Sequence, residues 1–245
     1  MKIVATIEAR MESSRLPGKT LAPILGRPML EMLIERLRRA RRVDQVVVAT
    51  TDRPADQAIE DLARRLDVGC FRGSSDDVLD RVLKAAQAHG ADLIVEMTGD
   101  CPLLDPTVVD EAIAIFLAGS FDYVSNVVER TYPRGLDTQV YPVKVLAQVD
   151  KLTQEPADRE NVSLYIYEHP QRFRLGHLYA SSKVRRPDLR LTVDTQPDLD
   201  LVRQIYEALY ARNSAFSLYD VIQLLEQQLA LVEINRQIRQ KAVRE

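Results

Sequence analysis

A basic segment near the N-terminus, ARMESSRLPGKT at residues 9–20, combines three cationic side chains with two serines and a glycine. The cations are Arg10, Arg15 and Lys19. Arginine forms paired hydrogen bonds with phosphate oxygens, lysine acts as a point charge, and small residues let backbone amides come close to an anion. The segment therefore predicts a phosphate-binding loop. A solvated basic turn is the alternative.

The last three residues of this segment, GKT, resemble the end of a P-loop, G-x-x-x-x-G-K-[ST]. The first glycine of that pattern falls on Ser13, and Pro23 disfavours the helix that a P-loop feeds after Gly18. We therefore expect a phosphate loop of another kind, in which the candidate nucleotide contacts are Ala9, Arg10, Ser13, Arg15 and Lys19.

Two aspartates follow apolar runs elsewhere in the chain. Asp100 lies in TGDCPLLDP and Asp194 in LTVDTQPDLDLV. Mg²⁺ takes one or two protein carboxylates and completes its shell with water and phosphate oxygens, so this pair could form such a site. The alternative for Asp100 is a helix cap, although Asp105 is better placed for one. Asp198 suits the first turn of a helix.

A third group of charges, in the second half, could bind an acidic substrate. Arg134 and Asp137 lie, with Arg130, around a Pro-Arg-Gly turn, and Arg159 lies where a helix begins. A hairpin turn with exposed charges and a helix cap are the respective alternatives.

The elements that must position these residues alternate in the first half. Continuous Val/Ile runs predict buried strands, and amphipathic stretches between them predict helices. The strands are expected at 2–9, 45–51, 68–73 and 91–100, and the helices at 30–42, 55–66, 74–90 and 105–119. Ligands bind at the carboxyl edge of such sheets, where the basic loop and Asp100 fall. The class is a three-layer α/β/α sandwich.

The second half reads less regularly. Strands are expected at 121–127, 136–143, 173–180 and 189–195, and helices at 160–170, 198–212 and 217–240, with a frayed end at KAVRE. We interpret 1–245 as one domain, with 128–180 as an excursion from its sheet and 217–245 as a C-terminal helical extension.

Composition excludes several classes of function. The net charge of −3 gives no general attraction to nucleic acid, and aromatic residues for base stacking are sparse. No apolar run reaches membrane-spanning length, and Cys70 and Cys101 read as reduced core residues, so a cytoplasmic protein is expected. No Ser-His-Asp or Cys-His arrangement is apparent.

Three motifs in order resemble the sugar-acid cytidylyltransferases, of the 3-deoxy-manno-octulosonate and acylneuraminate type, in the branch of spore-coat polysaccharide cytidylyltransferase-like proteins. They are IEARMESSRLPGKTL, TGDCPLLDP and LTVDTQPDL. The chain departs from the octulosonate enzymes at Cys101, where they carry an acid, and at Gln196, which separates Thr195 from Pro197.

The resemblance implies a glycosyltransferase-A type nucleotidyltransferase fold with a mixed, mostly parallel sheet. It implies attack of a sugar hydroxyl on CTP, with Arg10, Arg15 and Lys19 on the triphosphate and Mg²⁺ on Asp100 and Asp194. Arg15, Lys19 and Asp100 would be catalytic. It further implies nucleotide contacts from Arg72 and Ser75, sugar binding and dimerisation through 128–180, and a homodimer.

Two other functions stay open at this stage. A glycosyltransferase of the same fold would use a compact D-x-D metal motif, and the chain has DLD at 198–200, in a predicted helix start. A nucleotide-binding module without turnover is the second alternative, and it would be expected to lack Lys19 or Asp100.

Overall fold

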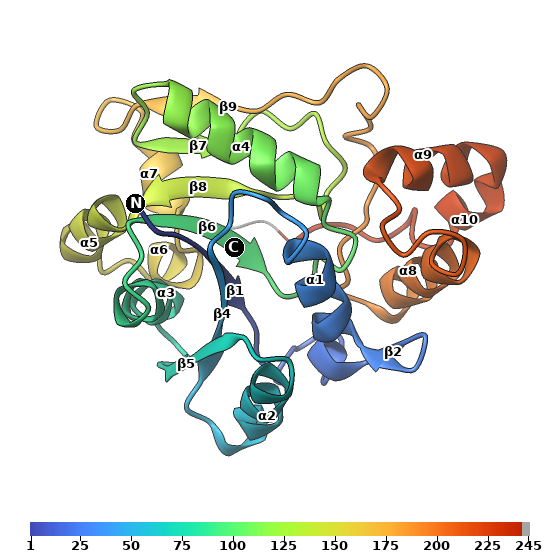
Figure 1. Ribbon diagram of the computed structural model, residues 1–245, viewed down its shortest axis with the longest axis horizontal. Coiled ribbons are helices and arrows are strands. Elements are labelled where there is room, and N and C mark those ends of the chain that lie inside the picture. The colour runs from blue at the N-terminus through green and yellow to red at the C-terminus, as the bar shows by residue number, and fades with distance from the viewer. Residues whose placement is uncertain (242–245) are drawn as a thin grey trace.

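A seven-stranded sheet with helices on both faces forms the centre of the computed structural model, which describes residues 1–241 (Figure 1). The strand order is β5-β4-β1-β6-β8-β7-β9. The strands are β1 (Ile3–Glu8), β4 (Gln45–Thr51), β5 (Gly69–Gly73), β6 (Leu93–Thr98), β7 (Tyr123–Ser125), β8 (Gln139–Pro142) and β9 (Leu175–His177). The predicted α/β/α sandwich with a mixed, mostly parallel sheet is confirmed.

The parallel part of the sheet comes from the continuous apolar runs of the first half. Strand β1 pairs in parallel with β4 and β6, and β4 pairs in parallel with β5. Along β1, Ile3, Ala5 and Ile7 enter one core cluster, while Val4 enters the cluster on the opposite face. Burial on both faces explains why these strands are apolar without alternation.

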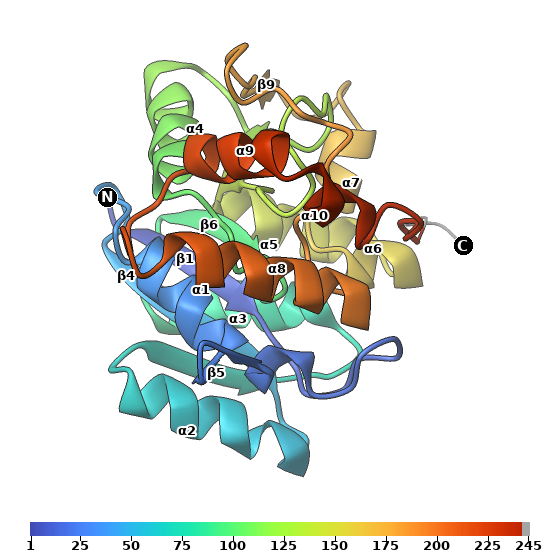
Figure 2. The same cartoon turned by 90° about the vertical axis from the view of Figure 1, so that its right-hand side faces the viewer.

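Two helical layers cover the sheet. One face packs against α1 (Met29–Leu37), α2 (Gln57–Arg65), α4 (Pro106–Ala118), α8 (Gln196–Leu209) and α9 (Leu218–Gln227). The other packs against α3 (Val78–Ala88) and α5 (Val143–Leu152). Helices α8 and α9 contact each other, and Figure 2 shows them side by side. Within residues 1–241 no helix has the length and apolar character to cross a membrane.

Short elements complete the N-terminal half. A 3₁₀ turn, η1 (Lys19–Leu21), follows the basic loop, and the small hairpin of β2 (Pro23–Ile24) and β3 (Arg27–Pro28) leads into α1. A second 3₁₀ turn, η2 (Pro54–Asp56), precedes α2. The helix predicted at 74–90 begins later than expected, because Asp77 caps α3 and the helix starts at Val78.

The second half differs from the expectations in its helices. Strand β8 is antiparallel to both β6 and β7, and β9 pairs in parallel with β7. The helix predicted at 160–170 is present only as the shorter α7 (Leu164–Glu168), which a turn at 161–163 separates from α6 (Pro156–Glu160). Helix α5 was not expected. The predicted 217–240 helix breaks at Gln228 into α9 and α10 (Leu229–Glu233).

The strand predicted at 189–195 is wrong. This largely buried segment contains bends and forms one isolated bridge, between Arg190 and Arg134, and its hydrogen bonds to loops do not repeat as a ladder. Leu191 N donates to Arg134 O at 2.7 Å, and Val193 N donates to Asp100 O at 2.8 Å. The second bond places Asp194 beside Asp100. Of the C-terminal residues expected to fray, 242–245 lie outside the described range.

Candidate active site

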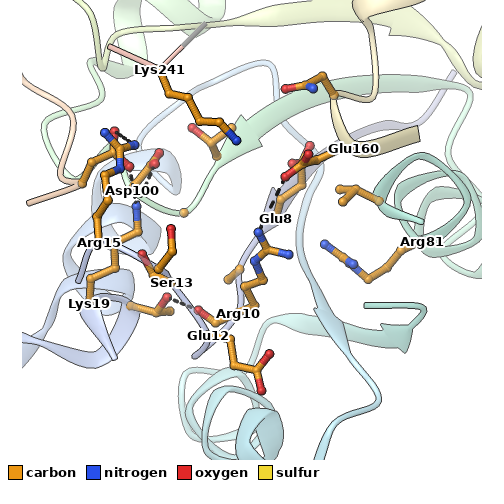
Figure 3. Close-up of a pocket in the computed structure, with 18 of the residues that line it drawn as sticks. Glu8, Arg10, Glu12, Ser13, Arg15, Lys19, Arg81, Asp100, Glu160 and Lys241 are labelled. Carbon is orange, nitrogen blue, oxygen red and sulfur yellow. Dashed lines mark hydrogen bonds and ion pairs between the residues drawn. The ribbon is translucent and has the colours of Figure 1, made fainter. Parts of the chain in front are cut away.

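A pocket of about 350 Å³ opens at the carboxyl ends of β1 and β6 (Figure 3). Its walls come from the end of β1 and the basic loop, the turn after β6, the first turns of α3, and the segments around 160, 194 and 240. The lining residues include Glu8, Ala9, Arg10, Ser13, Arg15, Lys19, Val78, Arg81, Asp100, Glu160, Asn161 and Asp194.

The basic loop is closed and tied down by backbone bonds. Gly18 N donates to Met11 O at 2.9 Å, and Gly18 itself has a φ of 74°, in the left-handed region that glycine tolerates. Met11 N donates to Oδ1 of Asp56 at 2.7 Å, and the Thr20 hydroxyl donates to Arg10 O at 2.8 Å. The loop is thus held at both ends, and Lys19 begins the η1 turn at its exit.

Gly99 brings the turn after β6 against the end of β1. Its amide donates to Glu8 O at 2.8 Å, and a Cβ at this position would lie only 2.7 Å from that oxygen. A side chain here would push the two strand ends apart. The glycine therefore sets Asp100 close to the basic loop.

Lys19 joins the two predicted metal ligands. Its Nζ atom lies 3.1 Å from Oδ2 of Asp100, 2.9 Å from Oδ1 of Asp194 and 2.7 Å from the carbonyl oxygen of Val193. Burial opposes the charged form of Lys19, but the two carboxylates outweigh it and raise the pKa of the amine. The amine is therefore held protonated at the centre of the site.

Asp194 is shared among three cations. Its second oxygen, Oδ2, forms an ion pair with Arg15 Nη2 at 2.9 Å and accepts a hydrogen bond from Arg190 Nη2 at 2.7 Å. Burial would raise the pKa of this carboxyl, yet Lys19, Arg190 and Arg15 together hold it below its usual range. Asp194 is thus ionised and oriented at neutral pH.

Asp198 has a different task from Asp194. It is fully buried and accepts bonds from the backbone amides of Asp194 and Thr195, from Arg190 and from Asn235. With Thr195 it forms the capping box of α8. The DLD sequence at 198–200 is therefore the start of a helix. Asp198, which would be the first metal ligand of a D-x-D motif, is instead used to cap that helix.

Seven of the predicted residues meet in this pocket. They are Ala9, Arg10, Ser13, Arg15, Lys19, Asp100 and Asp194. The reason is topological, because they follow β1 and β6, which are neighbours in the sheet, or lie in the 189–195 segment bonded to Asp100.

Two predicted nucleotide contacts lie outside it. Arg72 donates to the carbonyl oxygens of Thr51 and Arg53 and pairs with Glu60 at 3.0 Å, so its guanidinium ties β5 to the η2–α2 region. The Ser75 hydroxyl donates to Asp76 at 2.8 Å. The sequence placed both near the end of β5, but that strand is at the sheet edge, two strands from β1.

The predicted substrate-binding residues are likewise absent from the pocket lining. Asp137 forms a two-bond pair with Arg130, at 2.5 and 2.9 Å. Arg134 pairs through its backbone with the 189–191 segment. Arg159 bonds the α3 cap Asp77 and also Asp150 at 2.8 Å, which fixes α6 against α3 and α5.

Sequence reasoning missed several residues in or beside the site, and three of them are charged residues that act on it. Glu8 ends β1, Arg81 projects from α3, and Arg190 orients Asp194 from four positions earlier. Glu8 could have been predicted, because an acid at the end of an otherwise apolar strand is expected at the carboxyl edge of the sheet, where ligands bind. Arg81 could not, because a single arginine in an amphipathic helix predicts a solvated face, whereas here it is 2% exposed.

The carboxylates fit a divalent cation. Both Asp100 and Asp194 place an oxygen within 3.1 Å of one atom, Lys19 Nζ, so the two oxygens already converge on a cation. Among residues 1–241 no cluster of three or more His, Cys, Asp or Glu side chains could hold a metal alone. Two carboxylates that rely on phosphate oxygens to complete the shell are the arrangement that Mg²⁺ prefers.

Comparison with known proteins agrees with this geometry. The family model described as Cytidylyltransferase matches residues 4–238. The chain is 34% identical to the Bacillus subtilis spore coat polysaccharide biosynthesis protein SpsF, over 84% of this chain and 86% of that protein. It is 30% identical to an 8-amino-3,8-dideoxy-manno-octulosonate cytidylyltransferase of Shewanella frigidimarina, over 69% and 72% of the two chains.

A solved structure resembles almost the whole chain. It is that of a cytidylyltransferase from Leptospira borgpetersenii, 30% identical, with a TM-score of 0.91 over 98% of this chain and 100% of that one. A family match over most of the sequence, a fold shared along its length and a cationic pocket at the expected sheet edge lead to one conclusion. The chain belongs to the cytidylyltransferase family of nucleotidyltransferases.

Proposed function

We propose that the protein transfers CMP from CTP to a sugar acid, with Mg²⁺, and releases pyrophosphate. The observation that carries the proposal is the convergence of Lys19 with Asp100 and Asp194 beside the loop of Arg10 and Arg15. Such a site gathers cations for a triphosphate and acids for a metal in one small pocket.

The chemistry needs positioning more than covalent help. A sugar hydroxyl attacks the α-phosphorus of CTP and loses its proton to water, a new P–O ester bond forms, and the bond from the α-phosphorus to the pyrophosphate oxygen breaks. Arg10, Arg15 and Lys19 neutralise the charge that builds up on the phosphate oxygens and on the leaving pyrophosphate. The pocket supplies these cations without an activated nucleophile of its own.

Mg²⁺ would be held by Asp100 and Asp194, and when bound it would offset triphosphate charge and polarise the phosphoryl group. Lys19 lies between these carboxylates, and its amine is near enough to them to offer its charge to a phosphate oxygen beside the metal. The fixed contacts of Asp194 with Arg15 and Arg190 keep that carboxylate in position.

The acceptor and the setting rest on the relatives. One is named for an amino sugar acid and another for spore-coat polysaccharide, so we infer a sugar-acid acceptor and a role in surface glycan synthesis. Free thiols at Cys70 and Cys101 suit the reducing cytoplasm. We also infer a homodimer formed through the 128–180 segment, because the corresponding region of the family that the sequence resembles is its dimerisation region.

Pyrophosphate release tests the function. The protein is incubated with CTP, Mg²⁺ and a panel of octulosonic and nonulosonic acids, and released pyrophosphate is measured enzymatically. We expect release with at least one acid and background release when the acid is omitted. CTP binding without release for any acid would instead favour a binding module.

A further inference from the structure

The proposed mechanism assigns no role to the side chains at the end of the pocket away from Lys19. It is formed by Glu8, the last residue of β1, and by Val78 and Arg81 of α3. Figure 3 shows Glu8 and Arg81 on the opposite side of the pocket from Arg15, Lys19 and Asp100. The inference drawn from this end rests on the proposed use of CTP.

Glu8 offers an acceptor that the described part of the chain leaves unused. Its Oε1 atom is buried and has no hydrogen-bond partner within residues 1–241, and the same holds for Nε of Arg81. The neighbouring buried carboxyl, Glu96, is satisfied by Tyr141 at 2.6 Å and Gln139 at 2.8 Å. Burial, with Glu96 nearby, raises the pKa of Glu8 in the free protein, and a hydrogen bond donated by a ligand would favour its ionised, accepting form.

An unpaired buried acceptor is costly, so it favours a ligand that brings a donor. The charged parts of both substrates are poor candidates. The triphosphate and the carboxylate of a sugar acid are anions, and either would lie directly against the acidic side chain of Glu8. Arg10 and Arg81 also lie near this end, but Arg10 is 3.9 Å from Glu160. Arg81 donates to Ser74 O, so neither arginine gives the Oε1 atom of Glu8 a donor. The nucleobase is the neutral part that extends furthest from the triphosphate.

The edge of cytosine matches the charges of this end. Cytosine presents its 4-amino donor next to the N3 and O2 acceptors, whereas uracil presents an oxygen in place of the amino group. An acid that accepts from the cytosine amino group is a known pairing by chemistry, and a guanidinium suits ring acceptors. Uracil would set its O4 against the Glu8 carboxyl.

We propose that Glu8 selects cytosine by accepting a hydrogen bond from its 4-amino group, with Arg81 as the neighbouring donor for the ring acceptors. Val78 gives the ring an apolar surface at the same end. Specificity for the base thus comes from the strand end that directly precedes the phosphate loop.

A cycle of ligand and protein changes tests this. Dissociation constants are measured by calorimetry, with Mg²⁺ and no sugar acid, for CTP, UTP, 2′-deoxy-CTP and a CTP analogue that lacks the 4-amino group. The wild type should bind CTP about tenfold or more tightly than the analogue and UTP. Glu8→Leu should bind CTP and the analogue within about twofold of each other, and Glu8→Gln should show an intermediate preference.

The matched control is Glu226→Gln, an exposed carboxylate of α9 outside the pocket, which should keep the wild-type preference. Full discrimination in Glu8→Leu, or in Glu8→Gln if the leucine variant does not fold, would overturn the proposal. So would a change confined to the 2′-deoxy-CTP ratio, which would place Glu8 on the ribose. Because binding is measured without turnover, the outcome is independent of whether any sugar acid is accepted.

Discussion

The Nζ atom of Lys19 lies 2.9 Å from Oδ1 of Asp194, although the two residues are 175 positions apart in the sequence. The contact joins the basic loop near the N-terminus to the 189–195 segment, so that both line the same pocket. It depends on two local devices: the left-handed Gly18 that turns the chain into Lys19, and the bond from Val193 to Asp100 that holds the 189–195 segment in place.

Lys19→Met should lower turnover by about 10²-fold or more, since it removes a cation aimed at the transferred phosphate. It should also destabilise the apo protein modestly, by about 1–3 kcal/mol, because two carboxylates lose a partner. Steady-state kinetics and urea unfolding measure the two effects. Lys84→Met, an exposed lysine of α3, is the control, and equal losses in both variants would contradict the assignment.

Asp194→Asn and Asp198→Asn should separate metal binding from folding. Asn at 194 should raise the Mg²⁺ concentration for half-maximal activity, since a charged ligand is lost. Asn at 198 should lower the free energy of unfolding by about 3–5 kcal/mol, because Arg190 would keep a buried charge without its main partner. Mg²⁺ titrations of activity and denaturant unfolding measure the two effects. A larger change in Mg²⁺ requirement for Asp198→Asn, with a larger loss of stability for Asp194→Asn, would contradict these roles.

Arg15→Ala should raise KM for CTP about tenfold or more, whereas Arg72→Ala should leave it within about twofold. Arg15 lines the pocket, but the Arg72 guanidinium is bound to Thr51, Arg53 and Glu60. The Arg72 variant should lose stability instead, which thermal unfolding reports. A large rise in KM for Arg72→Ala would restore the nucleotide contact predicted from the family.

Glu96 should make stability depend on pH. Burial raises the pKa of this carboxyl to about 7 from an ordinary 4.5. A raised folded-state pKa stabilises the protein at low pH, fully below about 4.5, and the stabilisation is lost as the pH rises through 7. Glu96→Gln should therefore remove up to about 3 kcal/mol of the stability difference between pH 5 and pH 8.

Denaturant unfolding of wild type and Glu96→Gln at both pH values measures this difference. Glu111→Gln, at an exposed carboxyl of α4, should keep the wild-type difference in stability between the two pH values. If Glu96→Gln showed the same difference in unfolding free energy between pH 5 and pH 8 as the wild type, Glu96 would be ionised in the folded protein over this range.

The sequence predicted the part of the fold that is locally encoded. Strands β1, β4, β5 and β6 are continuous apolar runs separated by amphipathic helices, and their order along the chain places Lys19 and Asp100 at one edge. Strands β7 to β9 are short, and their partners lie far away in sequence, so only their approximate positions could be read.

The rest of the site depends on contacts that no local pattern contains. The 189–195 segment has the composition of a strand, yet it bonds to the loops at Arg134 and Asp100. The roles of Arg190 and Arg81 follow only from the folded structure, which places Arg190 against Asp194 and Asp198 and Arg81 near Glu8. Arg72 shows the reverse case, because an arginine at a strand end found its partners on η2 and α2 instead of the pocket.

The identity of the reaction products tests the central claim most directly. The protein is incubated with CTP, Mg²⁺ and each sugar acid of the panel in turn, and the phosphorus-containing products are followed by ³¹P NMR. We predict loss of the three CTP resonances, with the appearance of one phosphodiester signal from a CMP-linked sugar and an equal amount of pyrophosphate. Inorganic phosphate with a CDP-containing product, or CTP left intact with every acid, would contradict cytidylyl transfer.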